Sequence, residues 1–161
     1  MAVVEINLSP GDIAWAMTEG TARYNYNRAR GFTPTGQAPT WVEQLAREIS
    51  GCLGELAVAR WTDRFPFALF NDRKDGDVGP FEVRTTAYPT GRLLLTDGDN
   101  PQRKYLLVTL PTHYQAIIHG WMWGHEVMTD KYYNTTLRTP CYMVPQDDLY
   151  EPRSLFDDRG I

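Results

Sequence analysis

The chain has 161 residues, of which 42% are hydrophobic and 22% are charged, as in an ordinary globular protein. This length suits one domain and is too short for two ordinary ones, and no apolar run is long enough to span a bilayer. The net charge of −4 is not that of a protein with a strongly basic surface.

The charge is unevenly distributed along the chain. Residues 146–161 contain five acidic residues and two arginines, so this acidic tail carries −3 and the rest of the chain carries −1. Residues 20–41 contain three arginines and no acidic residue. The acidity of the whole chain therefore does not exclude a nucleic-acid partner for its body.

The remaining composition excludes several classes of protein. The N-terminus has no basic region followed by a long apolar core, and Cys52 and Cys141 lie outside any paired motif, so we expect a reduced, cytoplasmic protein. His119 and His125 are six residues apart, too far for a zinc pair on one helix; we expect His119 on a strand and His125 at its end. No Gly-rich phosphate loop and no Gly-x-Ser-x-Gly motif is present.

The first predicted helix begins at Pro10, with Ser9 as its N-cap, and runs to about Ala29. Its later part places polar and aromatic side chains on one stripe. Guanidinium and amide groups at this spacing suit successive phosphates, and a tyrosine suits stacking on a base. The simpler interpretation is a solvated helix face, and both remain open for Arg23, Tyr26, Asn27 and Arg30.

Residues 31–39 are rich in glycine and proline and predict a loop. A second helix is predicted from about Thr40 to Trp61, with apolar residues at helical spacing. Gly51 and Gly54 lie inside it, and such glycines indicate a close approach to another element. Small neighbours on the helix surface leave room for the carboxylate of Glu55 to reach whatever the helix packs on.

Strands are predicted over residues 81–86, 91–96, 105–110, 116–123 and 139–144. The third of these is apolar throughout and should be buried on both faces of a sheet. Residues 65–70 predict a connection and residues 71–75 a polar segment that leads into a turn. We expect the tail to pack on the domain through Leu149, Leu155 and Phe156.

The most informative stretch is residues 75–86, in which Gly79-Pro80 separates Asp77 from Glu82. A fully extended chain would hold these two carboxylates roughly 17 Å apart, whereas a reversal at Gly79-Pro80 brings them together across a hairpin. Beyond the turn, Glu82 and Arg84 share the strand face opposite the apolar residues. Asp75 competes with Asp77 for the position opposite Glu82.

The helix with Gly54-Glu55, followed by Asp77, by Glu82-Val83-Arg84 and by a buried strand, resembles the PD-(D/E)XK nuclease-like superfamily. The Gly120-Trp121 strand and the small size are similar to bacteriophage members. The resemblance covers roughly residues 40–145. It implies an α/β (α+β) fold with a mixed central sheet flanked by helices, an αβββαβ core, in a single domain. Residues 1–39 form an N-terminal helix and loop, and residues 146–161 form the tail.

The resemblance also implies a site that cuts or processes DNA with Mg²⁺ or Mn²⁺. Asp77 and Glu82 would bind the metal, the carbonyl of Val83 would complete its coordination, and Glu55 would support the metal or its waters. Such hard oxygen ligands are those that magnesium prefers. We therefore expect a metal-dependent nuclease for phage or prophage DNA, with Asp77, Glu82 and Glu55 as its acids.

Arg84 departs from the family pattern, which has lysine at this position. A guanidinium, with a pKa above 12, holds a phosphate or a water but does not act as a base. Three alternatives stay open: the metal alone generates hydroxide, another lysine such as Lys104 enters the site, or the protein does not cut. In the last case it would be a DNA-binding or protein-interaction module on a nuclease-like scaffold.

Overall fold

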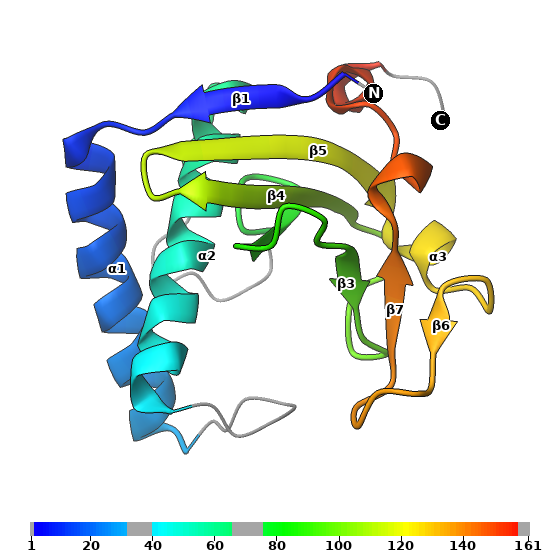
Figure 1. The fold of residues 1–161 in the computed structure, drawn as a ribbon, viewed down its shortest axis with the longest axis horizontal. Coiled ribbons are helices and arrows are strands. Elements are labelled where there is room, and N and C mark those ends of the chain that lie inside the picture. Colours follow the sequence, from blue (N-terminus) through cyan, green and yellow to red (C-terminus); the bar gives the residue numbers. More distant parts are fainter. Residues whose placement is uncertain (1, 32–39, 66–75, 158–161) are drawn as a thin grey trace.

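The computed structural model describes residues 2–31, 40–65 and 76–157. The described residues form a mixed α+β fold with two sheets and three α-helices (Figure 1). The larger sheet has four strands in the order β1–β5–β4–β2, and the smaller has three in the order β3–β7–β6. Predicted segments 32–39 and 66–75 lie outside the described residues. In chain order the elements are β1 (Val4–Asn7), α1 (Pro10–Ala29), α2 (Trp41–Thr62), β2 (Phe81–Thr86), β3 (Leu93–Leu95), β4 (Lys104–Thr112), β5 (Gln115–Trp123), α3 (Gly124–Val127), β6 (Tyr133–Asn134), β7 (Cys141–Val144), η1 (Gln146–Asp148) and η2 (Pro152–Phe156).

Both long helices begin with a capping box. The Ser9 hydroxyl accepts a hydrogen bond from Asp12 N, and the Asp12 carboxylate accepts one from Ser9 N. Thr40 and Glu43 form the same reciprocal pair at the start of α2. Each pair satisfies two backbone donors that a helix start leaves open, which explains why both predicted N-termini are confirmed.

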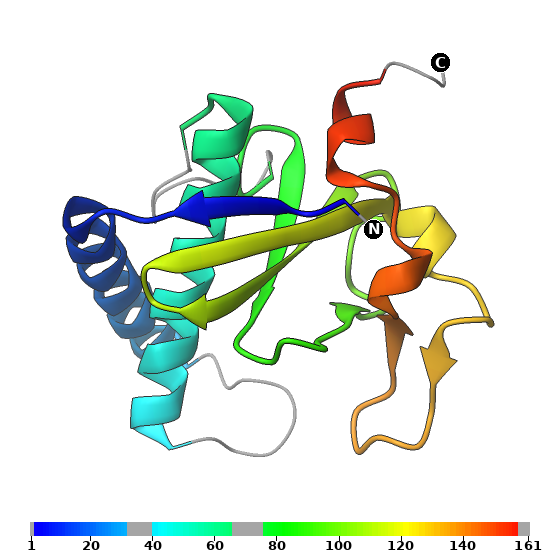
Figure 2. The same ribbon diagram turned by 45° about the horizontal axis from the view of Figure 1, so that its top comes forward.

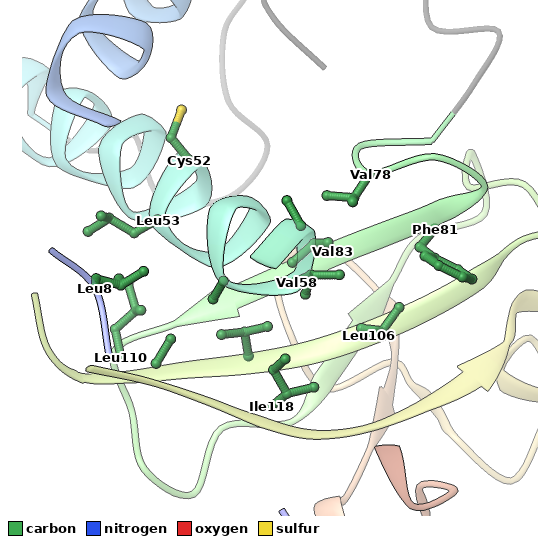
Figure 3. Packing of buried hydrophobic residues seen from close by; sticks show 14 of the residues in the cluster. Leu8, Cys52, Leu53, Val58, Val78, Phe81, Val83, Leu106, Leu110 and Ile118 are labelled. Atoms are coloured by element: carbon green, nitrogen blue, oxygen red, sulfur yellow. The ribbon is translucent and has the colours of Figure 1, made fainter. Parts of the chain in front are cut away.

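The four-stranded sheet carries an apolar core on each face. Strand β4 pairs parallel with β2 and antiparallel with β5, and its side chains alternate between the two cores. Leu106 and Val108 face α2, as Figure 3 shows for Leu106 beside Val83 and Val58. Tyr105 and Leu107 face the opposite way. The prediction that this strand is buried on both faces is confirmed.

The two helices lie together on one side, with α2 packed on the sheet and α1 packed on α2. The small sheet lies on the side of the molecule away from α1 (Figures 1 and 2). Strands β2 and β1 are at the two edges of the large sheet. The edge of β2 therefore has no neighbouring strand among the described residues, and the candidate site lies along it.

The predicted strands are present, with β3 three residues long and β4 extended at both ends. Strand β1 was not predicted, although Val4 and Ile6 alternate with polar residues. Leu149 and Leu155 of the tail are buried, and the Phe156 ring lies 5.1 Å from that of Trp61. His119 is on β5 and His125 is just beyond it, as expected. No helix in the described parts of the chain is long and apolar enough to cross a membrane.

Candidate functional site

The turn before β2 reverses the chain within four residues. Gly79 has a φ of 58°, a left-handed conformation that glycine adopts without strain. Val78 and Phe81 exchange two backbone hydrogen bonds of 3.1 Å across the turn. As a result Asp77 lies beside β2, where its Oδ2 accepts a 2.8 Å hydrogen bond from Val83 N. The predicted reversal at Gly79-Pro80 is present.

This hydrogen bond also orients the carbonyl of Val83. The N–H and C=O of one strand residue point to the same side of the strand. Because the Val83 N–H points away from β4 and toward Asp77, its carbonyl oxygen points to the same open edge. Arg84 Nη1 lies 3.5 Å from this oxygen. A carboxylate and a carbonyl therefore lie along one edge of β2.

Glu82 joins this edge as the second acid. Its carboxyl group lies within interaction range of that of Asp77. The pKa of Glu82 is raised to about 7, mainly by burial and also by the charge of Asp77, while the charges of Arg84 and Arg103 oppose the rise. The predicted pairing of Asp77 with Glu82 is therefore seen, whereas Asp75 lies outside the described residues. Two acids held this closely favour either a shared proton or a cation between them.

Glu55, the third predicted acid, is on α2 and is bound by Arg23 of α1. Its two oxygens accept hydrogen bonds of 2.7 and 2.8 Å from Arg23 of α1. The pKa of Glu55 is raised to about 7, mainly by burial and also by the charge of Asp77, while Arg23 opposes the rise. Glu55 is thus within electrostatic range of Asp77, but its carboxylate is fully engaged by a guanidinium.

A close contact between helix and strand sets the position of Glu55. A Cβ atom built on Gly54 would lie 1.9 Å from Thr85 Oγ1, so only glycine allows this approach of α2 to β2. The expectation that an interior glycine marks a close approach is confirmed at Gly54. At Gly51 such a Cβ meets no atom of the described residues within 4 Å, apart from the backbone of the helix itself. This packing brings the Gly54-Glu55 part of α2 against β2.

Arg84, the residue that replaces the family lysine, is firmly held. Its Nη2 donates a 2.7 Å hydrogen bond to Asp99 Oδ1, and its guanidinium lies 5.0 Å from the centre of the Tyr105 ring. A guanidinium with both contacts has little freedom to turn toward another ligand. Arg84 therefore links β2 to the turn before β4.

Lys104 does not fill the position of the missing lysine. Strand alternation places Lys104 with Leu106 on the face toward α2, whereas Glu82 is opposite Tyr105 on the other face. The Lys104 ammonium group lies 4.7 and 5.0 Å from the rings of Trp121 and Trp123, and it donates to the Leu155 carbonyl. This arrangement contradicts the alternative in which Lys104 enters the site.

The predicted stripe on α1 is divided. Arg23 pairs with Glu55 and Glu19, and Asn27 donates a 3.0 Å hydrogen bond to Glu48 of α2. These two side chains thus face the neighbouring helix. Arg30 and Tyr26 are exposed, with the guanidinium 5.1 Å from the ring centre. Only the latter two keep the solvent-facing arrangement that a nucleic-acid contact would need.

Sequence reasoning missed two members of the site, Asp99 and Arg103. Arg103 Nε lies 3.5 Å from Glu82 Oε1, and Asp99 holds Arg84. Both residues follow β3 in a turn-rich segment, and no motif or spacing connects them with Glu82. The one available signal was the charged pair Arg103-Lys104 directly before the predicted buried strand at residues 105–110.

The donor set along β2 suits a hard divalent cation. Asp77, Glu82 and the Val83 carbonyl offer oxygens, and Mg²⁺ commonly binds through one or two carboxylates and keeps several waters. Within residues 2–31, 40–65 and 76–157, no group of three or more Asp, Glu, His or Cys side chains is arranged to hold a metal ion. The fit therefore rests on two carboxylates and a carbonyl, with Glu55 held apart by Arg23.

Comparison of the chain with protein-family models, with curated proteins and with solved structures finds no match.

The raised pKa of Glu82 predicts that stability falls as pH rises. Between pH 4.5 and 7 the folded state keeps a proton that the unfolded chain has released, so the fall should be on the order of 2 kcal/mol. Urea unfolding across this range measures it. Glu82→Gln should remove this share and leave the fall that belongs to Glu55. A slope unchanged by Glu82→Gln would contradict the assignment.

Proposed function

We propose that this chain is a metal-dependent nuclease of the PD-(D/E)XK type that hydrolyses phosphodiester bonds in phage or prophage DNA. One observation carries the proposal: the turn at Gly79 brings the carboxylate of Asp77 against Glu82 and the backbone of Val83. The mixed sheet, with α2 packed on β2 through Gly54, agrees with such a core. The helix that follows β5 has only four residues, shorter than the αβββαβ pattern implies.

Asp77, Glu82 and the carbonyl of Val83 are the groups that would hold Mg²⁺ or Mn²⁺. Such an ion lowers the pKa of a bound water and stabilises the negative charge that develops on a phosphate under attack. A bound cation would favour the ionised form of both carboxylates. Their partial burial strengthens this electrostatic preference for a cation.

The other charged groups of the site orient their neighbours or contribute to the local electric field. Arg84 does not act as a base because a guanidinium is not deprotonated in proteins. Its pairing with Asp99 keeps the guanidinium beside β2. Glu55 contributes its negative charge to the field at Asp77, and Arg23 fixes the direction of its carboxylate. Residue 84 would therefore not take the proton of the attacking water, which would pass to bulk solvent.

The decisive experiment is a cleavage assay in Mn²⁺ and in Mg²⁺ with single-stranded, duplex and branched DNA. Glu82→Ala should reduce cleavage at least about a hundredfold because it removes a metal ligand. Glu151→Ala is a suitable control, since its exposed side chain makes no capping hydrogen bond to η2. Cleavage by Glu82→Ala at the wild-type rate would overturn the proposal.

A thermal-unfolding assay tests the metal site without any substrate. Mg²⁺ or Mn²⁺ should raise the midpoint at pH 8, where Glu82 is ionised, and should have little effect at pH 5. The shift should disappear in Glu82→Gln and persist in Glu151→Ala. A shift that Glu82→Gln leaves intact would place the ion elsewhere.

The second candidate is a catalytically inactive module that binds DNA or a protein on the same scaffold. Two contacts favour it: Arg84 is engaged by Asp99, and Glu55 is neutralised by Arg23. Such a module would bind DNA, or a protein, without regard to divalent metal. Retained DNA binding in EDTA, together with no cleavage under any metal condition, would select this candidate.

A further inference from the structure

The connection between β2 and β3 links the two sheets. It comprises residues 87–92 and directly follows the strand that carries Glu82 (Figure 2). Residues 88–91 form a β-turn, in which Gly91 N donates a 2.9 Å hydrogen bond to Tyr88 O. Pro89 occupies the second position of this turn, where its restricted φ favours the reversal. The connection is therefore a defined turn and not an extended loop.

Hydrogen bonds to η1 and to the end of β2 hold this turn. Gln146 Nε2 donates hydrogen bonds of 2.8 Å to Pro89 O and 3.0 Å to Gly91 O. Tyr88 N donates a 3.2 Å hydrogen bond to Thr86 Oγ1. A Cβ atom built on Gly91 would lie 2.3 Å from Thr86 Cγ2, so the turn packs directly against the end of β2. The backbone that carries Tyr88 is thus held from two parts of the chain.

The side chain of Tyr88 is exposed although its backbone is held. Tyr88 is 75% exposed, so its ring contributes little to the packing of the domain. An aromatic side chain on a fixed backbone has few rotatable bonds, and little conformational entropy is lost when a ligand binds to it. The ring is therefore suited to stack on a planar ligand.

The sequence around the turn is basic, within a chain of net charge −4. Residues 83–96 contain Arg84 and Arg92 and no acidic residue. Arg84 is paired with Asp99, whereas Arg92 is exposed and lies one residue beyond the turn. Proteins bind single-stranded nucleic acid with this combination of groups, since an aromatic ring stacks on a base and a cation meets the backbone phosphate.

The turn follows the end of the strand that carries the candidate metal ligands. From Glu82 to Thr86, β2 rises about 13 Å at about 3.3 Å per residue. Stacked nucleotides of one DNA strand rise about 3.4 Å each. A few nucleotides therefore span the distance from the acid pair to the turn, and one DNA strand can reach both.

We propose that Tyr88 and Arg92 bind an unpaired stretch of the substrate strand, with a base stacked on the Tyr88 ring and a phosphate beside Arg92. This inference rests on the proposed function and names its substrate class, which is DNA that is single-stranded next to the cleaved phosphate. In a duplex each base is already stacked between its neighbours, so its face is not open to a tyrosine. The contact sets binding and specificity and takes no part in the hydrolysis.

The test measures binding of a fluorescently labelled DNA strand, alone and annealed to its complement, by anisotropy in Ca²⁺ over a range of salt. Tyr88→Ala should weaken binding of the single strand about fivefold to a hundredfold and leave binding of the duplex unchanged. Tyr88→Phe keeps the ring and should bind as the wild-type protein does. Arg92→Ala should flatten the salt dependence of single-strand binding by about 0.7 in log–log slope, whereas Arg92→Lys should keep it.

Two further variants test whether the effect belongs to the ring of Tyr88. Tyr88→Leu keeps an apolar side chain without a flat ring, so it should lose nearly as much affinity as Tyr88→Ala. Tyr133→Ala removes an exposed tyrosine from β6, at the edge of the small sheet away from β3, and should change neither affinity nor slope. Because Tyr88 is exposed, its variants should unfold close to the wild-type midpoint. A lower midpoint shared by Tyr88→Ala and Tyr88→Leu would assign the loss to packing and overturn the stacking role.

The outcomes separate this inference from the proposed function. Wild-type single-strand affinity in Tyr88→Ala, or equal losses for single strand and duplex, would overturn the stacking role while leaving cleavage by the wild-type protein unaffected. An unchanged slope in Arg92→Ala would overturn the role of Arg92. A wild-type protein that cleaves no DNA, yet loses single-strand binding in Tyr88→Ala, would overturn the proposed function and keep the contact. A wild-type protein that binds no DNA would overturn both.

Discussion

Arg23→Ala is expected to lower the free energy of unfolding by about 3–5 kcal/mol at pH 8, since it leaves a buried carboxylate without its partner. The Glu55 side chain is only 8% exposed and accepts both of its close hydrogen bonds from Arg23. Burial already raises the pKa of Glu55 to about 7. Without the guanidinium, ionisation of Glu55 in the folded state would cost still more.

The loss should depend on pH in a definite direction. In Arg23→Ala the folded state holds the Glu55 proton to a higher pH, while the unfolded state releases it near 4.5. Stability should therefore fall more steeply with rising pH in the variant than in the wild-type protein. The destabilisation should be small at pH 5 and largest at pH 8, as measured by urea unfolding at both.

Two variants make this test specific to the Arg23–Glu55 pair. Arg23→Ala/Glu55→Gln should recover much of the stability at pH 8, because it removes the buried charge together with its partner. Arg28→Ala takes an exposed arginine from the same helix, where its guanidinium contacts Tyr24, and should cost less than about 1 kcal/mol. Equal losses for Arg23→Ala and Arg28→Ala would show that the buried pair is unimportant.

Gly54→Ala and Gly51→Ala should have effects of opposite sign. The added Cβ at position 54 would overlap Thr85 Oγ1 at 1.9 Å, so α2 or β2 must shift, at a cost of about 1–3 kcal/mol. At position 51 the Cβ meets no other part of the described chain within 4 Å, and alanine should gain about 1 kcal/mol from its better helix propensity. Urea unfolding of the two variants gives the comparison directly.

Thr85→Ala provides the second half of this test. Thr85 Oγ1 is buried and has no hydrogen-bond partner in the described parts of the chain, so its removal alone should cost little. Gly54→Ala/Thr85→Ala should regain part of the loss, since the closest atom is gone and the remaining contact is 3.0 Å. Gains from alanine at both positions 51 and 54 would refute the close packing of α2 on β2.

Local features could be predicted from sequence because they depend on neighbouring residues. Ser9 with Asp12 predicted one helix start, and the Gly-Pro turn predicted the reversal that pairs Asp77 with Glu82. These interactions close rings within a few residues, so no distant part of the chain decides them. The same holds for β4, whose apolar run already indicates burial on both faces.

Contacts between distant residues could not be predicted in this way. Arg23 has the spacing of a solvated or phosphate-binding stripe, yet it pairs with Glu55, which is 32 residues away. Lys104 and Arg103 are adjacent, and only strand alternation sends one toward two tryptophans and the other toward Glu82. Side-chain direction at each position depends on the register of β4 against β2.

The amino-acid sequence by itself determined the two capped helices, the buried strand and the turn that brings two acids together, since each follows from hydrogen bonds and apolar spacing within a short segment. Only the tertiary structure decided the partners of those acids. Glu55 lies against Arg23 because α1 packs on α2, and Glu82 lies against Arg103 because Arg84 and Tyr105 hold the turn before β4. Long-range packing determines which charged side chains meet, and the spacing of these residues along the sequence does not indicate those contacts.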